Sequence, residues 1–120
     1  MATIRYFVDD VDRALPFYVD RLEFTLTKRF PPIAILSKGD LTLWLSGPDS
    51  SAARPMPDGR KPGPGGWNRL VVEVPDLEEA VAALRGAGVV FRNDIVTGPG
   101  GKQILAEDGS GNVVEFFEPA

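Results

Sequence analysis

The hydrophobic and polar positions of the chain follow one pattern twice, about 66 residues apart. Residues 4–14 read IRYFVDDVDRA, and residues 70–80 read LVVEVPDLEEA. In each copy, an alternating segment typical of a strand is followed by apolar residues at helical spacing. A repeat of this period indicates two equivalent supersecondary units, each of which is expected to need the other to bury its apolar face.

The first copy predicts a strand over residues 2–8 and then a helix, because Val11, Ala14, Leu15, Tyr18 and Leu22 share one helical face. Asp9 or Asp10 is available as its N-cap. Three further strands are predicted at residues 24–30, 33–37 and 41–46. We therefore expect the order strand, helix, strand, strand, strand.

The second copy predicts the same order. A strand over residues 70–74 precedes a helix that begins at Leu77 after the cap Asp76 and ends at Gly86 or Gly88. Strands are predicted at residues 89–93, 102–107 and 113–118, separated by glycine-rich turns.

Residues 47–66 lie between the two copies and hold five of the eleven prolines and five glycines. This composition predicts that the segment forms no regular element. Two interpretations remain open, a mobile connector or a lid over a binding site. The chain is thus one domain over residues 1–120, with module 1 at 1–46, the connector at 47–66 and module 2 at 67–120.

Composition excludes several kinds of chemistry. The chain has 120 residues, a net charge of −4, no histidine and no cysteine. Zero cysteines exclude disulfides and zinc-thiolate sites, and without histidine the usual nucleophile–base pairs cannot form. No basic footprint for nucleic acid is present. No apolar run approaches the roughly 18 residues of a membrane helix, and no signal-peptide pattern is visible, so we expect a cytoplasmic protein that binds neither nucleic acid nor membrane.

Three motifs carry a family resemblance. They are VDDVDRALPFY at residues 8–18, VPDLEEA at 74–80 and DGSGNVVEF at 108–116. In this order and spacing, the chain resembles the vicinal oxygen chelate superfamily, which includes glyoxalase I, fosfomycin-resistance enzymes, extradiol dioxygenases and bleomycin-binding proteins. Glu23 stands where the family usually has glycine, and Ser110 lies inside the last turn; both change the local demands on the backbone.

The resemblance implies an α+β fold of two βαβββ modules, which form half-open β-barrels around a cavity. Modules pair within one chain or across a dimer, and we expect a homodimer. Metal-binding relatives use one ligand on the first strand and one on the last strand of each module. Matching places Thr3, Arg69 and Glu115 at three of these positions. The fourth is Trp44 or Leu43, and the alternation favours Trp44, because Leu41, Leu43 and Leu45 form a continuous apolar face.

This ligand set predicts that no metal binds at the family's position and that the protein needs no cofactor. Only Glu115 is a good ligand, and Arg69 is a permanent cation that repels a divalent ion. Two roles are open for Arg69 and Glu115. They form a buried ion pair, or Arg69 holds an anionic group of a ligand while Glu115 accepts a proton or hydrogen bond from it.

Alternation adds further residues to the expected cavity wall. Arg5 and Glu73 either line it or are hydrated at an edge, and the aromatic residues supply a flat apolar surface or belong to the core. The complete set of expected ligand-binding residues is Thr3, Arg5, Phe7, Trp44, Trp67, Arg69, Glu73, Glu115 and Phe117.

Two functions follow from the resemblance. The first, which we prefer, is a metal-free protein that sequesters a small aromatic or amphipathic molecule, as bleomycin-resistance proteins do in antibiotic resistance. The second is a glyoxalase-like lyase or isomerase, or a dioxygenase-related enzyme, with Glu115 as base and Arg69 stabilising an oxyanion. Catalysis itself is left open by the sequence.

Overall fold

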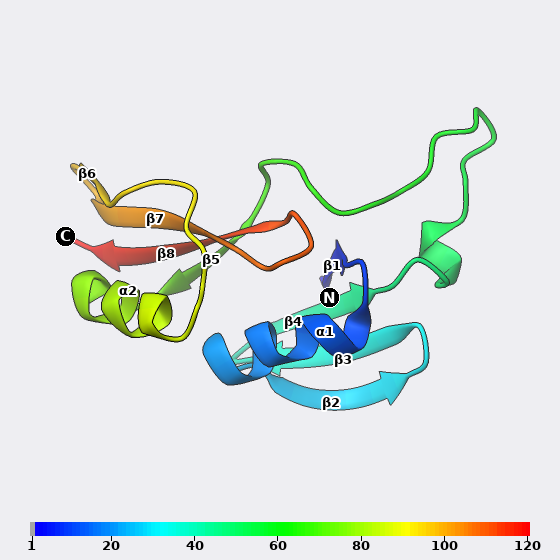
Figure 1. Ribbon diagram of the computed structural model, residues 1–120, viewed down its shortest axis with the longest axis horizontal. Helices are drawn as coiled ribbons and strands as arrows, with labels where there is room; N and C mark the ends of the chain where they lie inside the picture. The colour runs from blue at the N-terminus through cyan, green and yellow to red at the C-terminus, as the bar shows by residue number, and fades with distance from the viewer. Residues whose placement is uncertain (1) are drawn as a thin grey trace. The chain divides into compact units, whose positions relative to one another are not determined.

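The computed structural model describes residues 2–120, which divide into two compact units, Met1–Gly65 and Gly66–Ala120. Each unit contains one four-stranded sheet with a helical segment between its first and second strands (Figure 1). The predicted order of one strand, a helix and three strands is confirmed in both units, and so is the α+β class. Neither sheet is closed within the described residues, which agrees with a half-open barrel.

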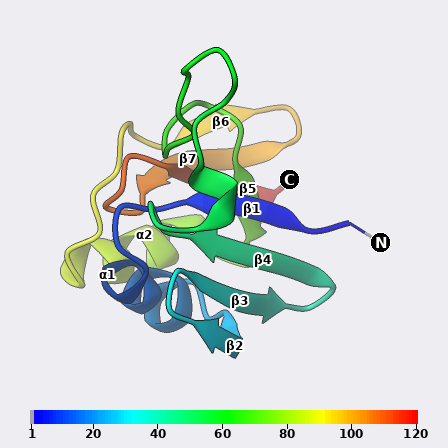
Figure 2. The same cartoon turned by 90° about the vertical axis from the view of Figure 1, so that its right-hand side faces the viewer.

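The first unit contains β1 (Ile4–Phe7), α1 (Val11–Leu15), the π-helical segment η1 (Pro16–Arg21), β2 (Thr25–Phe30), β3 (Ile33–Lys38) and β4 (Leu41–Ser46). Its strands lie in the order β1-β4-β3-β2 (Figure 2). β1 runs parallel to β4, and the other neighbours are antiparallel. The helical segment provides the crossover that a parallel pair requires.

The helical segment of the first unit begins at its predicted cap and then changes its hydrogen bonding. The Asp10 side chain accepts a hydrogen bond from the Arg13 backbone N–H at 3.1 Å. Pro16 has no N–H to donate to the preceding turn, and beyond it the Leu22 N–H donates to the Phe17 carbonyl at 3.0 Å, five residues back. Tyr18 remains on the sheet side of this wider turn and is fully buried.

The core of the first unit lies between the helical segment and one face of the sheet. The largest buried side chains of that face are Leu36, Leu43 and Leu45. Tyr18 packs edge-to-face on Phe24, with ring centroids 6.2 Å apart. The predicted alternation of β4 is confirmed in this way, because its leucines belong to the helix-covered face.

Glu23 lies in the first unit at the position where the resembled family usually has glycine. Its φ is 63°, which makes it the one non-glycine residue in the left-handed region among residues 2–120. The departure therefore places an L side chain where the backbone favours glycine.

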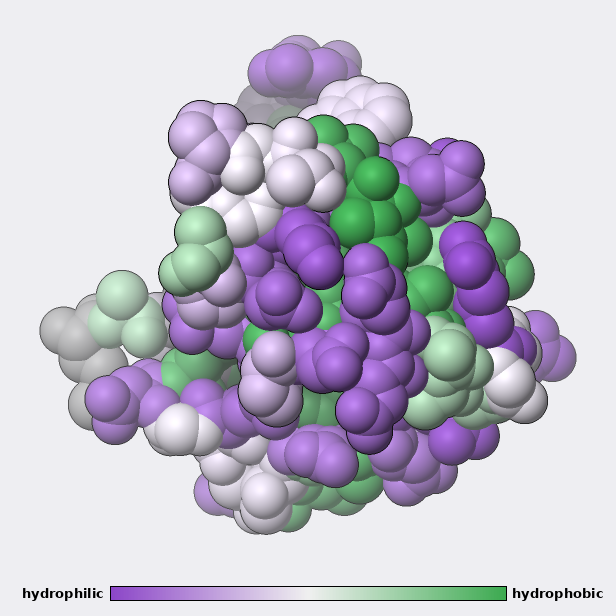
Figure 3. Space-filling view, turned by 90° about the vertical axis from the view of Figure 1, so that its left-hand side faces the viewer, coloured by the Kyte–Doolittle hydropathy of each residue, from purple (hydrophilic) through white to green (hydrophobic). Residues whose placement is uncertain are grey.

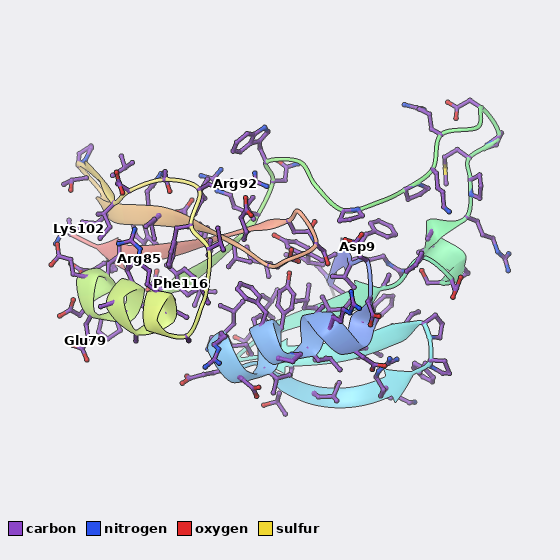
Figure 4. All side chains as sticks on the ribbon, viewed as in Figure 1. Asp9, Glu79, Arg85, Arg92, Lys102 and Phe116 are labelled. Atoms are coloured by element: carbon purple, nitrogen blue, oxygen red, sulfur yellow. The ribbon has the colours of Figure 1, made fainter. Side chains whose placement is uncertain are left out.

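The second unit contains β5 (Leu70–Glu73), α2 (Leu77–Gly86), β6 (Val96–Gly98), β7 (Gly101–Glu107) and β8 (Val113–Pro119), in the sheet order β5-β8-β7-β6. Asp76 caps α2 by accepting a hydrogen bond from the Glu79 backbone N–H. Phe116 is buried between β8 and α2 (Figure 4).

The strand predicted at residues 89–93 is wrong. Only an isolated bridge from Phe91 to Ala106 forms there, and the edge strand is β6 instead. The Asn93 side-chain oxygen accepts a hydrogen bond from the Leu105 backbone N–H at 2.9 Å. This N–H is therefore not available for the backbone hydrogen bond that a continuous strand at residues 89–93 would form with β7.

The segment at 47–66 contains one short 3-10 helix, η2 (Ser51–Ala53), so the expectation of no regular element is wrong at these three residues. The turn ends at Arg54, just before Pro55. No helix within residues 2–120 is long and apolar enough to cross a membrane. Hydrophilic residues cover most of the face drawn in Figure 3.

Candidate functional site

The face of the first sheet that lies opposite the helical segment is built from rows of side chains that cross all four strands. One row is Arg5, Trp44, Ile35 and Lys28, which are successive register partners on β1, β4, β3 and β2. The neighbouring row is Phe7, Ser46, Ile33 and Phe30. Register partners point to the same face of a sheet. We call these two rows together the open face.

The centre of the open face is apolar and accessible. Trp44, Ile35, Ile33 and Phe7 are each half-buried, in contrast to the fully buried leucines on the helix-covered face. Phe30 is 42% exposed at the edge. A flat apolar surface of this kind is suited to contact with an aromatic ring.

Arg5 is ordered against this surface. Its guanidinium carbon lies 4.9 Å from the centroid of the Trp44 ring, and its Nη1 donates to the Ser46 hydroxyl at 3.3 Å. The interpretation of Arg5 as merely hydrated at an edge does not describe this geometry, because the side chain is half-buried and stacked.

Trp44 occupies the position in the first sheet that Glu115 occupies in the second. Arg5 pairs with Trp44, and Val71, which lies 66 residues after Arg5, pairs with Glu115. The register therefore selects Trp44 over Leu43 as the counterpart of Glu115.

Arg69 and Glu115 meet in the second unit. Arg69 Nε and Nη2 lie 3.0 and 2.9 Å from the same carboxylate oxygen, Oε1, and Arg69 Nη1 donates to the Trp67 carbonyl at 3.3 Å. The side chains are 27% and 10% exposed, respectively. The second oxygen of Glu115 accepts no hydrogen bond from any other residue in the range 2–120.

The turn before β8 fixes the start of the strand that carries Glu115. Asp108 is buried, and its Oδ1 accepts hydrogen bonds from the backbone N–H groups of Ser110 and Asn112. Its Oδ2 accepts a hydrogen bond from the Asn112 amide at 2.8 Å. Gly109 and Gly111 supply the positive φ values, 88° and 94°, that this turn needs.

Trp67 belongs to a second cluster that sequence reasoning did not find. Trp67 is 67% exposed, and the centroid of its ring lies 5.1 Å from the guanidinium carbon of Arg92. Arg92 also bonds Glu107 at 2.8 Å and the Gly111 carbonyl at 3.0 Å. Arg92 lies within residues 89–93, where the sequence pattern predicts a strand, and no motif marks it as a functional residue.

Of the remaining expected site residues, Glu73 and Phe117 are register partners on β5 and β8, whereas Thr3 lies outside the strands. Thr3 is exposed just before β1, Glu73 is exposed at the end of β5, and Phe117 is half-buried on β8. In the first unit, Pro62, Gly63 and Pro64 return to the end of the sheet and line a small cavity of about 90 Å³ with Phe7 and Ser46.

The donor set at the family's metal positions does not fit a divalent ion. Within residues 2–120, no three aspartate or glutamate side chains lie close enough to hold a metal ion. Glu115 is the one good ligand of the set, and one of its oxygens is already bonded to a guanidinium.

Comparison with protein families agrees with this architecture. The model of the Glyoxalase/Bleomycin resistance protein/Dioxygenase superfamily matches residues 1–116. The chain belongs to this superfamily, as its motifs and its paired βαβββ units indicate. No curated protein matches the chain significantly.

Solved structures with the same fold differ in what their names state. TnmS3, an antibiotic binding protein from Streptomyces sp. CB03234, is 25% identical, with a TM-score of 0.76 over 100% of this chain and 96% of its own. Lactoylglutathione lyase from Agrobacterium tumefaciens is 19% identical, with a TM-score of 0.77 over 98% and 92%. TioX from Micromonospora sp. ML1 is 21% identical, with a TM-score of 0.76 over 100% and 99%. The last two show the fold alone.

Proposed function

We propose that this protein binds a small aromatic or amphipathic molecule without metal and sequesters it, in the manner of an antibiotic-binding protein. The observation that carries the proposal is the open face of the first sheet, where Trp44 lies half-buried among aliphatic and aromatic side chains. A tryptophan that is already ordered loses little conformational freedom on binding and offers a large contact area. The likeness to TnmS3, an antibiotic binding protein, supports a binding role of this kind.

A panel of aromatic antibiotics that includes bleomycin tests the proposal through thermal shift and tryptophan fluorescence. The chain has two tryptophans, so Trp67→Phe leaves Trp44 as the single reporter. We expect at least one compound to raise the Tm and quench Trp44, and Trp44→Leu to weaken its binding about tenfold or more. Trp67→Leu is the matched variant in the second unit. If no compound in the panel alters either signal, the binding function is refuted.

The alternative is a lyase or isomerase that uses Glu115 as base and Arg69 as oxyanion stabiliser. One observation favours it, because the second oxygen of Glu115 accepts no hydrogen bond within residues 2–120 and is available to a ligand. The prior bond to Arg69 opposes it, since a substrate anion must displace a close ion pair.

Recovery of the bound compound separates the two functions. Sequestration leaves the compound unchanged after prolonged incubation, whereas an enzyme converts it and loses turnover in Glu115→Gln. Metal analysis of the purified protein is expected to find no stoichiometric metal, and a chelator is expected to leave the Tm unchanged. Stoichiometric metal that the chelator removes, together with a fall in Tm, would contradict the metal-free proposal.

We also propose that the protein is a cytoplasmic homodimer. Support for the dimer comes from family membership, because modules of this fold pair within a chain or across two chains. Sedimentation velocity on the full chain measures the mass directly, and a monomer at micromolar concentration would contradict the proposal.

A further inference from the structure

The four strands of the first sheet have an unusual charge composition for an acidic protein. They contain Arg5, Lys28, Arg29 and Lys38 and no aspartate or glutamate. The strands of the second sheet contain four glutamates and only one basic residue, Lys102. The net charge of the whole chain is −4. The carboxylates of the first unit are thus confined to its helical segment, turns and connector.

The register divides the four cations between the two faces of the sheet. Arg29 and Lys38 pair with Ala34 and Leu41, on the helix-covered side, and Arg29 bonds Asp12 at 2.9 Å. Arg5 and Lys28 lie in one row on the open face, with Trp44 and Ile35 between them. Three strand spacings place these two strand positions about 14 Å apart.

Neither cation on the open face has an acidic partner among residues 2–120. Lys28 Nζ lies 5.1 Å from the Phe30 ring centroid, and Arg5 has the Trp44 ring and the Ser46 hydroxyl. Arg29 and Arg60, by contrast, form ion pairs with Asp12 and Asp58. In the second unit, Glu115, at the position equivalent to Trp44, forms an ion pair with Arg69.

We infer that the molecule bound on the open face is an anionic aromatic, a planar ring system that carries a carboxylate, sulfonate or phosphate group. The ring lies over Trp44 and Ile35, and the anionic group is bound by Arg5, with Lys28 contributing positive potential at the far end of the row. A half-buried guanidinium that is oriented by a neighbouring hydroxyl and not neutralised is suited to an oxyanion. The inference rests on the proposed binding function and narrows its ligand class.

Three probes with the same ring and different charge test the inference. They are 2-naphthoate, 2-naphthamide and 2-naphthylmethylammonium, titrated calorimetrically into the full chain. We expect 2-naphthoate to bind about tenfold or more tighter than 2-naphthamide, and the cationic probe to bind weakest, because charge-assisted hydrogen bonds contribute more than neutral ones. The preference should fall as salt is raised, since part of it is screened.

Substitutions of Arg5 and Lys28 test which residues cause the preference for the anionic probe. In Arg5→Gln the preference for 2-naphthoate over 2-naphthamide should disappear while binding of 2-naphthamide is retained, and Arg5→Lys should restore part of it. Lys28→Gln, at an exposed position that is expected to tolerate change, should reduce it about twofold to threefold. The matched control is Arg13→Gln, an exposed arginine on α1 with the same change in charge, which should leave the preference intact.

The outcomes separate the inference from the function on which it rests. If all three probes bind equally, or the cationic probe binds best, the anionic class is wrong and the binding function survives. If none binds, the inference is overturned, and the result of the antibiotic panel decides separately whether the binding function stands. If sedimentation shows that Arg5→Glu dissociates a dimer whose assembly excludes 2-naphthoate, a second copy of the chain occupies the open face and the inference is overturned.

Discussion

Removing Arg69 should lower the stability of the protein more than removing its ion-pair partner Glu115. Both contacts to Glu115 Oε1 are near 3 Å, at 3.0 and 2.9 Å, a separation at which oppositely charged groups attract by several kcal/mol in a surface-like dielectric before desolvation is subtracted. Glu115 is 10% exposed, whereas Arg69 is 27% exposed. A stranded Arg69 can regain water by a small movement of a long side chain, but a stranded Glu115 cannot.

We therefore expect Arg69→Met to lower the free energy of unfolding by about 3 kcal/mol and Glu115→Gln to lower it by only about 1 kcal/mol. The double variant should lose less than the sum of the two single losses, because no unpaired charge remains in it, with a coupling energy of about 1–3 kcal/mol. Urea unfolding of the wild type, the two single variants and the double variant, followed by far-ultraviolet circular dichroism, gives the free energies for this double-mutant cycle.

The second sheet provides a matched control in Arg92 and Glu107. Their Nε–Oε1 distance is 2.8 Å, and the glutamate side chain is 36% exposed. The two arginines are about equally exposed, so the pairs differ mainly in the exposure of the carboxylate. The corresponding cycle should give a coupling energy below about 1 kcal/mol, since the more exposed carboxylate is better screened. The contact of Arg92 with Trp67 cancels, because it is lost in both the single and the double variant. Equal costs for Arg69→Met and Glu115→Gln, or a neutral Arg69→Met, would refute the reasoning from burial.

Three further predictions concern stability. Glu23→Gly should raise the free energy of unfolding by about 1 kcal/mol in urea, because φ is 63° there, whereas Glu23→Ala keeps the strain and should not; a neutral glycine variant would mean that the strain is negligible. Gly101→Ala should lower the Tm strongly and cost about 2 kcal/mol or more, since a Cβ would overlap the Glu118 carbonyl, whereas Gly100→Ala has open space and should be nearly neutral. The hydrogen bond to Glu78, with the Glu118 charge, raises the pKa of Lys102 above its ordinary value. The native state thus binds this proton more tightly than the unfolded chain does. The interaction of Lys102 with Glu78 and Glu118 therefore stabilises the native state below the ordinary lysine pKa, and this stabilisation is lost as the pH rises through the raised native pKa. Alkaline unfolding should therefore be steeper in the wild type than in Lys102→Met, and parallel curves would contradict the shift.

Much of the architecture was predictable from the sequence because local and repeated signals agree. The apolar alternation of β4 and the helical spacing after Asp10 and Asp76 each specify which face is buried. The caps follow from single side chains that accept a backbone hydrogen bond three residues on. The strand predicted at residues 89–93 does not form, and the Asn93 side chain there accepts a hydrogen bond from the Leu105 backbone N–H. Residue composition does not reveal this hydrogen bond.

Residue type and spacing were sufficient to predict the two βαβββ modules, the family and the poor metal ligands at its usual positions. Which charged side chains pair with each other depends on the folded arrangement of the strands and could not be predicted in this way. Arg5 and Arg69 lie near the starts of equivalent strands, yet Arg69 meets Glu115, whereas Arg5 stacks on Trp44 with no acidic partner among residues 2–120. The difference arises because the partner of a charge is set by the register of non-adjacent strands, β1 with β4 and β5 with β8.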